Sequence, residues 1–144
     1  LETWRGGGGE RLFTAYSLSP SRFWTFVQID KRKKEQAFAN LVRAYRKEHV
    51  GKGPEKINVD FKDNWAIAFM QGALSKVENF YLRDERNEEM LRHARTQEVK
   101  RLYDEVNPDE MEELVGAKFV KLFTDVDLAA DEVVSIFVFD KSIE

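Results

Sequence analysis

Apolar residues follow two different spacings along this chain, and the spacings predict its elements. Apolar and polar residues alternate over 57–61, which predicts a half-buried strand, and 65–70 is apolar throughout, which predicts a central strand. The two-residue link between them fits a hairpin. Two further apolar segments, 119–125 and 133–139, predict a second hairpin that closes the chain.

Helical spacing appears in the segments between these strands. Over 31–50 apolar residues recur at i, i+3, i+4 and i+7, and a Gly-Lys-Gly-Pro turn at 51–54 ends that helix. A capping-box pattern beginning at Ser75 opens a second helical region, and 91–106 carries mostly helical spacing after a polar stretch. A short helix follows over 107–116, with Asn and Pro at its start and Gly at its end.

The resulting unit has the order α-β-β-α-α-β-β over residues 31–144. Antiparallel hairpins with intervening helices predict an α+β fold, in which the helices pack on one face of an antiparallel sheet. The segments 65–70 and 133–139 are apolar at positions that point to both faces of such a sheet. We therefore expect the second face to be covered as well.

An internal repeat marks the two ends of the chain. A shift of 110 positions places Arg11–Asp30 on Lys121–Asp140 without a gap, with five identical residues, Leu12, Phe13, Thr14, Leu18 and Asp30. We therefore predict an extra N-terminal hairpin, with strands 11–16 and 22–30, matching the closing one. On this interpretation 1–30 is the tail of a truncated or preceding copy in a tandem protein, and 31–144 is a complete domain.

A two-stranded hairpin is marginal by itself. We expect 1–30 to dock on the 31–144 unit, either as extra strands of its sheet or by exchange with a second molecule. The predicted assembly is a homodimer, or a monomer in which the repeats pair within the chain.

Composition indicates a soluble globular chain without disulfides. Hydrophobic residues make up 42% and charged residues 34% of the 144, the net charge is −3, and there is no cysteine. No apolar run is long enough to insert into a membrane, and a cytoplasmic location fits the absence of cysteine.

Short motifs in a fixed order link the chain to a bacterial family. They are a basic helix running into Gly51-Lys52-Gly53-Pro54, a hairpin ending in Gly72-Ala73-Leu74, a charged helical region, and Gly116 followed by Leu122-Phe123-Thr124-Asp125. Over roughly 35–140 the chain resembles the MpsC-like family, also catalogued as a domain of unknown function. The resemblance implies a small cytoplasmic protein accessory to a membrane-potential-generating, ion- or bicarbonate-transport system. It carries over no catalytic residue.

The candidate interaction surface is the basic helix and the turn after it. It comprises Lys31, Arg32, Lys33, Lys34, Arg43, Arg46, Lys47 and Lys52. Such a surface could bind the phosphate backbone of a nucleic acid, and aromatic residues near the N-terminus could stack on bases. No RNA- or DNA-binding motif accompanies them, so a solvated helix face is the preferred interpretation.

Catalytic, metal and cofactor patterns are weak. The Gly51–Pro54 turn follows a helix and lacks the GxxxxGK[ST] pattern of a phosphate loop. His49 and His93 are far apart and lack partner ligands, and Asp125, Asp127 and Asp131 do not form a calcium loop. We predict no catalytic residue, no metal and no cofactor.

The leading prediction from sequence is an uncharacterised cytoplasmic interaction or regulatory module without enzymatic activity. The alternatives are a nucleic-acid-binding domain using helix 31–49 and a small-ligand-binding enzyme.

Overall fold

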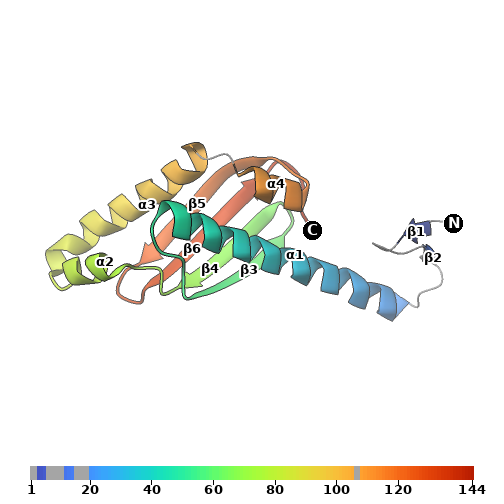
Figure 1. The fold of residues 1–144 in the computed structure, drawn as a ribbon, viewed down its shortest axis with the longest axis horizontal. Helices are drawn as coiled ribbons and strands as arrows, with labels where there is room; N and C mark the ends of the chain where they lie inside the picture. Colours follow the sequence, from blue (N-terminus) through green and yellow to red (C-terminus); the bar gives the residue numbers. More distant parts are fainter. Residues whose placement is uncertain (1–2, 6–11, 15–19, 106–107) are drawn as a thin grey trace. The chain divides into compact units, whose positions relative to one another are not determined.

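The computed structural model describes residues 3–5, 12–14, 20–105 and 108–144. The chain divides into two compact units, Leu1–Lys33 and Lys34–Glu144. In the first unit, β1 (Thr3–Arg5) pairs antiparallel with β2 (Leu12–Thr14) in a two-stranded sheet of their own (Figure 1). An extra N-terminal hairpin is therefore present, and its strand β2 lies within the predicted strand 11–16, but the partner of β2 is β1 and not the predicted strand 22–30.

The predicted strand 22–30 is wrong. Pro20 begins helix α1 (Pro20–His49), which runs without interruption to the Gly-Lys-Gly-Pro turn. Proline is well suited to the first helical turn, and neither glycine nor proline occurs between it and Gly51 to end the helix. The repeat with 121–140 is thus a similarity in sequence only, because 22–30 is helical whereas the matching 132–140 contains strand β6. Its tandem origin stays a prediction.

The second unit is built on a four-stranded antiparallel sheet, in the order β3-β4-β6-β5. The strands are β3 (Lys56–Lys62), β4 (Trp65–Gln71), β5 (Phe119–Asp127) and β6 (Glu132–Phe139). The two hairpins join through β4 and β6, whose register pairs Trp65 with Val138 and Gln71 with Glu132. This confirms the predicted α+β class and the order of elements.

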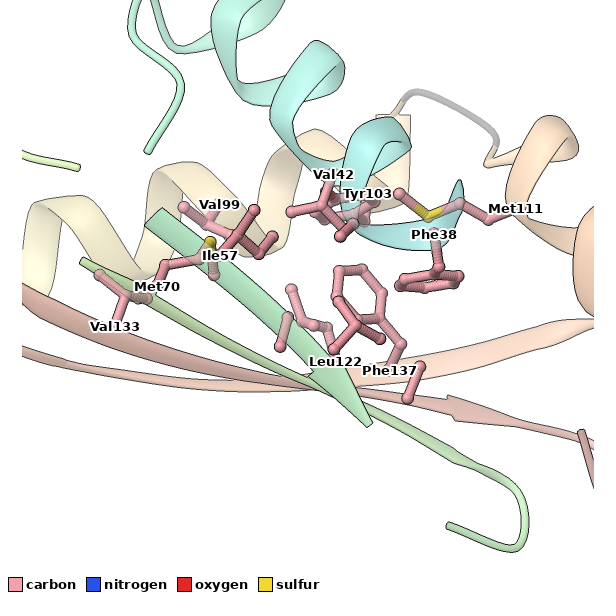
Figure 2. Packing of buried hydrophobic residues seen from close by; sticks show 14 of the residues in the cluster. Phe38, Val42, Ile57, Met70, Val99, Tyr103, Met111, Leu122, Val133 and Phe137 are labelled. Carbon is pink, nitrogen blue, oxygen red and sulfur yellow. The ribbon is translucent and has the colours of Figure 1, made fainter. Parts of the chain in front are cut away.

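Helices cover one face of this sheet and enclose the core. The inner face carries alternate strand residues such as Ile57, Met70 and Phe137, and these pack against α1 and against α3 (Glu88–Glu105), where Tyr103 lies (Figure 2). Phe38 of α1 packs edge-on against Phe61, Phe137 and Phe139, with ring centroids 5.2–6.2 Å apart. Strand alternation and helical spacing thus meet in one cluster, the arrangement that the sequence pattern predicts.

The connections confirm several local signals. Ser75 caps α2 (Lys76–Tyr81) in a complete capping box with Glu78. The polar stretch after α2 interrupts the helical region, with a single 3-10 turn, η2 (Glu85–Asn87), before α3. Gly116, with φ of 69°, ends α4 (Asp109–Val115) in the left-handed conformation. The predicted cap at Asn107 lies outside the described residues.

Candidate interaction surfaces

The side of the sheet opposite the helices carries an apolar stripe, which we call the outer face. It comprises the alternate residues of β4 and β6, together with one residue of β5: Trp65, Ile67, Phe69, Phe123, Val134, Ile136 and Val138. Cross-strand pairs join them, Ile67 with Ile136 and Ile136 with Phe123. Three large aromatic side chains in this stripe are well exposed, Trp65 by 44%, Phe69 by 39% and Phe123 by 52%.

Charged residues flank the stripe, and along β5 and β6 their signs differ between its two ends. Lys121 lies at the end where β4 begins, paired with Val138. Asp127 and Glu132 lie at the other end, paired with each other. The Lys121 ammonium lies over the Phe123 ring, 5.2 Å from its centre, which is a cation–π contact. The outer face therefore combines an apolar centre with a polar rim.

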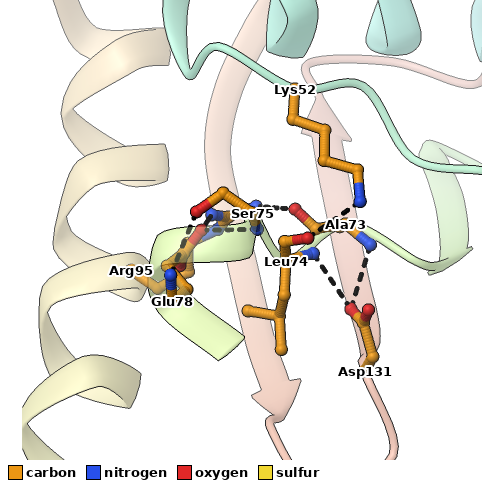
Figure 3. Close-up of polar contacts among 7 residues, drawn as sticks. All are labelled: Lys52, Ala73, Leu74, Ser75, Glu78, Arg95 and Asp131. Carbon is orange, nitrogen blue, oxygen red and sulfur yellow. Dashed lines mark hydrogen bonds and ion pairs between the residues drawn. The ribbon is translucent and has the colours of Figure 1, made fainter. Parts of the chain in front are cut away.

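A second feature is the loop Gly72-Ala73-Leu74, which is held by charged side chains from three distant segments (Figure 3). Asp131 accepts hydrogen bonds from the backbone N–H groups of Ala73 (2.9 Å) and Leu74 (3.1 Å). Arg95 donates to the Ala73 carbonyl (2.7 Å), and Lys52 donates to the Leu74 carbonyl (2.8 Å). The loop therefore connects the β5–β6 hairpin, the turn after α1 and helix α3 through these hydrogen bonds.

Arg95 is buried and ion-paired. Its guanidinium also bonds to Glu78, whose carboxylate completes the capping box of α2 by accepting from the Ser75 N–H. Glu78 thus neutralises the arginine and helps to cap a helix. The sequence offers a signal for this pair, because Arg95 lies four residues from both Leu91 and Val99 on the apolar side of α3.

The eight basic residues predicted as one surface do not behave alike. Arg32, Lys33, Lys34 and Lys47 are exposed, and Lys31 and Arg43 are half-buried. Lys52 is tied to the Leu74 carbonyl. The prediction that Arg46 belongs to an exposed surface is wrong, because this residue is buried, with 1% of its surface exposed. It follows Phe38 and Val42 at intervals of four, so the apolar side of α1 carries it into the interior.

Within the described residues, buried Arg46 has no counterpart to the Arg95–Glu78 pair. Its Nε and Nη1 atoms are fully buried and have no hydrogen-bond partner among the described residues, and neither has the Tyr103 hydroxyl. Burial lowers the pKa of Arg46 to about 10, so it stays protonated at neutral pH. Burial raises the pKa of Tyr103 above its ordinary value, so the phenol stays neutral.

The remaining candidates lie apart from one another. His93 is exposed on α3, and His49 stacks on Tyr45 at the end of α1. Asp131 serves the 72–74 loop, and Asp127 accepts from the Ala130 N–H in the hairpin turn. Across the described residues, no group of three histidines or acids is placed to hold a metal. The helices of the described part are all too short or too polar to cross a membrane.

These features define a class, a helix-covered antiparallel sheet whose other face is apolar and open. The chain belongs to the family described as "Na+-translocating membrane potential-generating system (MpsC)", whose model matches residues 30–141. It is 43% identical over 112 residues to the uncharacterized protein YrhF of Bacillus subtilis (strain 168), an alignment covering 78% of this chain and 92% of that protein. The comparison with solved structures gave no match.

Proposed function

We propose that this chain is a non-enzymatic cytoplasmic interaction module of the Na+-translocating system in its family's description, and that it works as a homodimer paired through the outer face. The observation that carries the proposal is the exposure of Trp65, Phe69 and Phe123 in one apolar stripe. Contiguous apolar patches with a polar rim are typical of protein interfaces.

A second copy of this chain is the occupant that the charges favour. In the proposed dimer the outer faces of two copies stack on each other. The two-fold axis lies between the two sheets and runs perpendicular to the strands, so each strand lies over the same strand of the other copy in the opposite direction. Lys121 of one copy then faces Asp127 of the other, while the apolar centres of β4 and β6 meet. An interface of this kind is self-complementary, as a two-fold dimer requires. Strand β3 does not add to this complementarity, because the same axis places Lys62 of one copy opposite Lys56 of the other.

Sheet packing also explains the composition of the two central strands. Strands buried on both faces read as continuous apolar runs, whereas a sheet with one solvated face alternates. Edge strand β3 alternates, with Lys56, Asn58, Asp60 and Lys62 on the outer side. Central strands β4 and β6 do not, which fits an outer face covered at its centre.

Sedimentation velocity over a range of concentrations tests this proposal. We expect the wild type to dimerise, and Phe69→Asp, which places a charge at the centre of the stripe, to weaken association by more than tenfold. Burial of an unpaired carboxylate at an interface costs several kcal/mol, and a tenfold change in the dissociation constant corresponds to about 1.4 kcal/mol. Val77→Asp is the matched control, because Val77 is equally apolar and 64% exposed but lies on α2.

The direction of the two-fold axis has its own test. Lys121→Glu should weaken the dimer, and adding Asp127→Lys should restore it, because the pair is then re-formed with exchanged signs. A wild type that is monomeric at every concentration would sink the homodimer. Association that responds to Val77→Asp and not to Phe69→Asp would place the interface elsewhere.

A further inference from the structure

A groove of about 520 Å³ lies between helices α1 and α4. Each helix lines it with residues at i, i+3 and i+4, the spacing of one helix side. They are Ala37, Asn40 and Leu41 of α1 and Glu110, Glu113 and Leu114 of α4. Leu41 and Leu114 are half-buried against the core, whereas Asn40 and the two glutamates are exposed. The groove therefore has an apolar base and an acidic rim on the α4 side.

Helix α4 is fixed in this position by contacts on its other side. Met111 is fully buried in the core. The Glu112 carboxylate accepts a hydrogen bond from the Phe119 N–H of β5, with a distance of 2.7 Å. The acidic rim is thus presented by an anchored helix, and a ligand in the groove would not have to order it.

The two glutamates of the rim have no partner within the described part of the chain. Neither Glu110 nor Glu113 makes an ion pair or a side-chain hydrogen bond there. Glu110 lies in the first turn of α4, where a negative charge stabilises the positive end of the helix dipole. Glu113 lies near the other end of this short helix, where a negative charge is unfavourable. The stability of α4 therefore does not explain Glu113.

The electrostatic potential beside the groove is negative. Burial, and after it the charges of three carboxylates, raise the pKa of the Tyr45 phenol, one helical turn after Leu41 on α1. The carboxylates are those of Glu110, Asp109 and Glu48. A phenolate is disfavoured there because the acids act on it together.

Basic residues of α1 do not neutralise this potential. Arg43 and Lys47 lie next to Gly53 in the turn after α1, and Arg46 is buried. None of these three lines the groove, and no other described basic residue does. The positive charge that would complement the rim must therefore come from another molecule.

We propose that the α1–α4 groove binds a basic amphipathic helix of a partner protein, with an apolar side chain on Leu41 and Leu114 and Lys or Arg side chains at Glu110 and Glu113. Helix α4 has seven residues, about 10 Å at 1.5 Å per residue, so the groove holds roughly two turns of such a helix. Lys- and Arg-rich segments flank the cytoplasmic ends of membrane-spanning helices. The choice of partner thus rests on the proposed role beside a membrane system.

Fluorescence anisotropy with two labelled peptides tests the groove on the full chain at physiological salt. One peptide of about 15 residues carries leucines on one side of a helix and lysines elsewhere. The other has the same composition with the leucines spread around the helix. We expect the patterned peptide to bind at least about tenfold more tightly, because only it places its leucines and lysines in register with the base and the rim.

Two variants and two matched controls locate the peptide. Asn40→Arg puts a cation into the groove at an exposed helical position, and we expect it to weaken binding by about tenfold or more. Gln97→Arg adds the same charge on exposed α3 and should bind as the wild type does. The double variant Glu110→Gln with Glu113→Gln should bind several-fold more weakly, and Glu85→Gln, an exposed acid in η2, should have little effect.

Three results would overturn this inference. They are equal affinity for the two peptides, equal weakening by Asn40→Arg and Gln97→Arg, and no binding by the wild type. The first two would mean attraction by net charge alone. Self-association that is lost in Asn40→Arg would instead assign the groove to a second copy. Phe69→Asp should bind the peptide as the wild type does, so failure of the dimer and failure of the groove are separate results.

Discussion

The two faces of the four-stranded sheet are both apolar at their centres, yet within the described part of Lys34–Glu144 the helices cover only one of them. On the inner face, Met70 and Phe137 are fully buried beneath α1 and α3. On the outer face, Phe69, next to Met70 in β4, keeps 39% of its surface exposed. Phe123, which follows the β5 partner of Phe137, keeps 52% exposed. Apolar strand composition alone therefore does not decide which face becomes the core; the helices that pack on one face do.

The largest contrast should come from truncating one aromatic residue on each face. Phe137→Ala removes a ring packed against Phe38 and Tyr103, and we expect a loss of about 3–5 kcal/mol in the free energy of unfolding. Phe123→Ala should cost less than about 1 kcal/mol in dilute protein and more at higher concentration, because its burial depends on association. Urea unfolding at two protein concentrations measures both changes. A concentration-independent loss of similar size at both positions would break the distinction between the faces.

The 72–74 loop extends the comparison from apolar packing to polar contacts, because hydrogen bonds to this loop hold the end of β4 in place. Asp131→Ala leaves the N–H groups of Ala73 and Leu74 without their acceptor, and we expect a loss of about 2 kcal/mol. Asp131 also adopts a φ of 53°, a conformation that Asn tolerates. Asp131→Asn should therefore recover part of the loss in urea unfolding. An Asp131→Ala variant as stable as the wild type would show that packing alone holds the loop.

A smaller effect is expected at the other side of the same loop. From sequence alone, Lys52 is a surface residue whose removal should change stability by no more than about 0.5 kcal/mol. Because its ammonium donates to the Leu74 carbonyl at 2.8 Å, we now expect Lys52→Ala to cost about 1 kcal/mol, and Lys56→Ala, exposed on the outer side of β3, to cost less. Equal stability of the two variants in urea would show that the Lys52–Leu74 hydrogen bond does not stabilise the fold.

Local patterns predicted most of the second unit, because its elements are decided by neighbours in sequence. The alternation in β3, the capping box at Ser75 and the left-handed Gly116 each depend on a few adjacent residues. The apolar central strands also predict a second covered face, and that covering stays a prediction. The repeat misled at 22–30, because matching letters do not carry the helix-starting Pro20 and the unbroken sequence that follows it.

The interior polar contacts were out of reach for a different reason. Arg46 and Arg95 both interrupt apolar helix stripes, which signals buried charge, but their partners lie on other elements. Whether a buried arginine meets a described carboxylate, as Arg95 does, or none of them, as Arg46 does, is decided by packing between α1, α2 and α3. The contact of Lys52 could not be predicted for the same reason, since Leu74 lies 22 residues away.

The dimer through the outer face is tested most directly by the distance between two spin labels, one on each copy. The chain has no cysteine, so Asn58→Cys labels the outer side of β3 and Lys100→Cys labels the helix layer on the opposite side. Stacked sheets lie about 10 Å apart, which places the labels of Asn58→Cys within roughly 30 Å of each other. The helix layers add roughly a helix diameter on each side, which separates the labels of Lys100→Cys by roughly 40 Å. Double electron–electron resonance should therefore show the short distance at position 58 and the long one at position 100. The reverse order, or no dipolar coupling at position 58 in concentrated protein, would contradict the account.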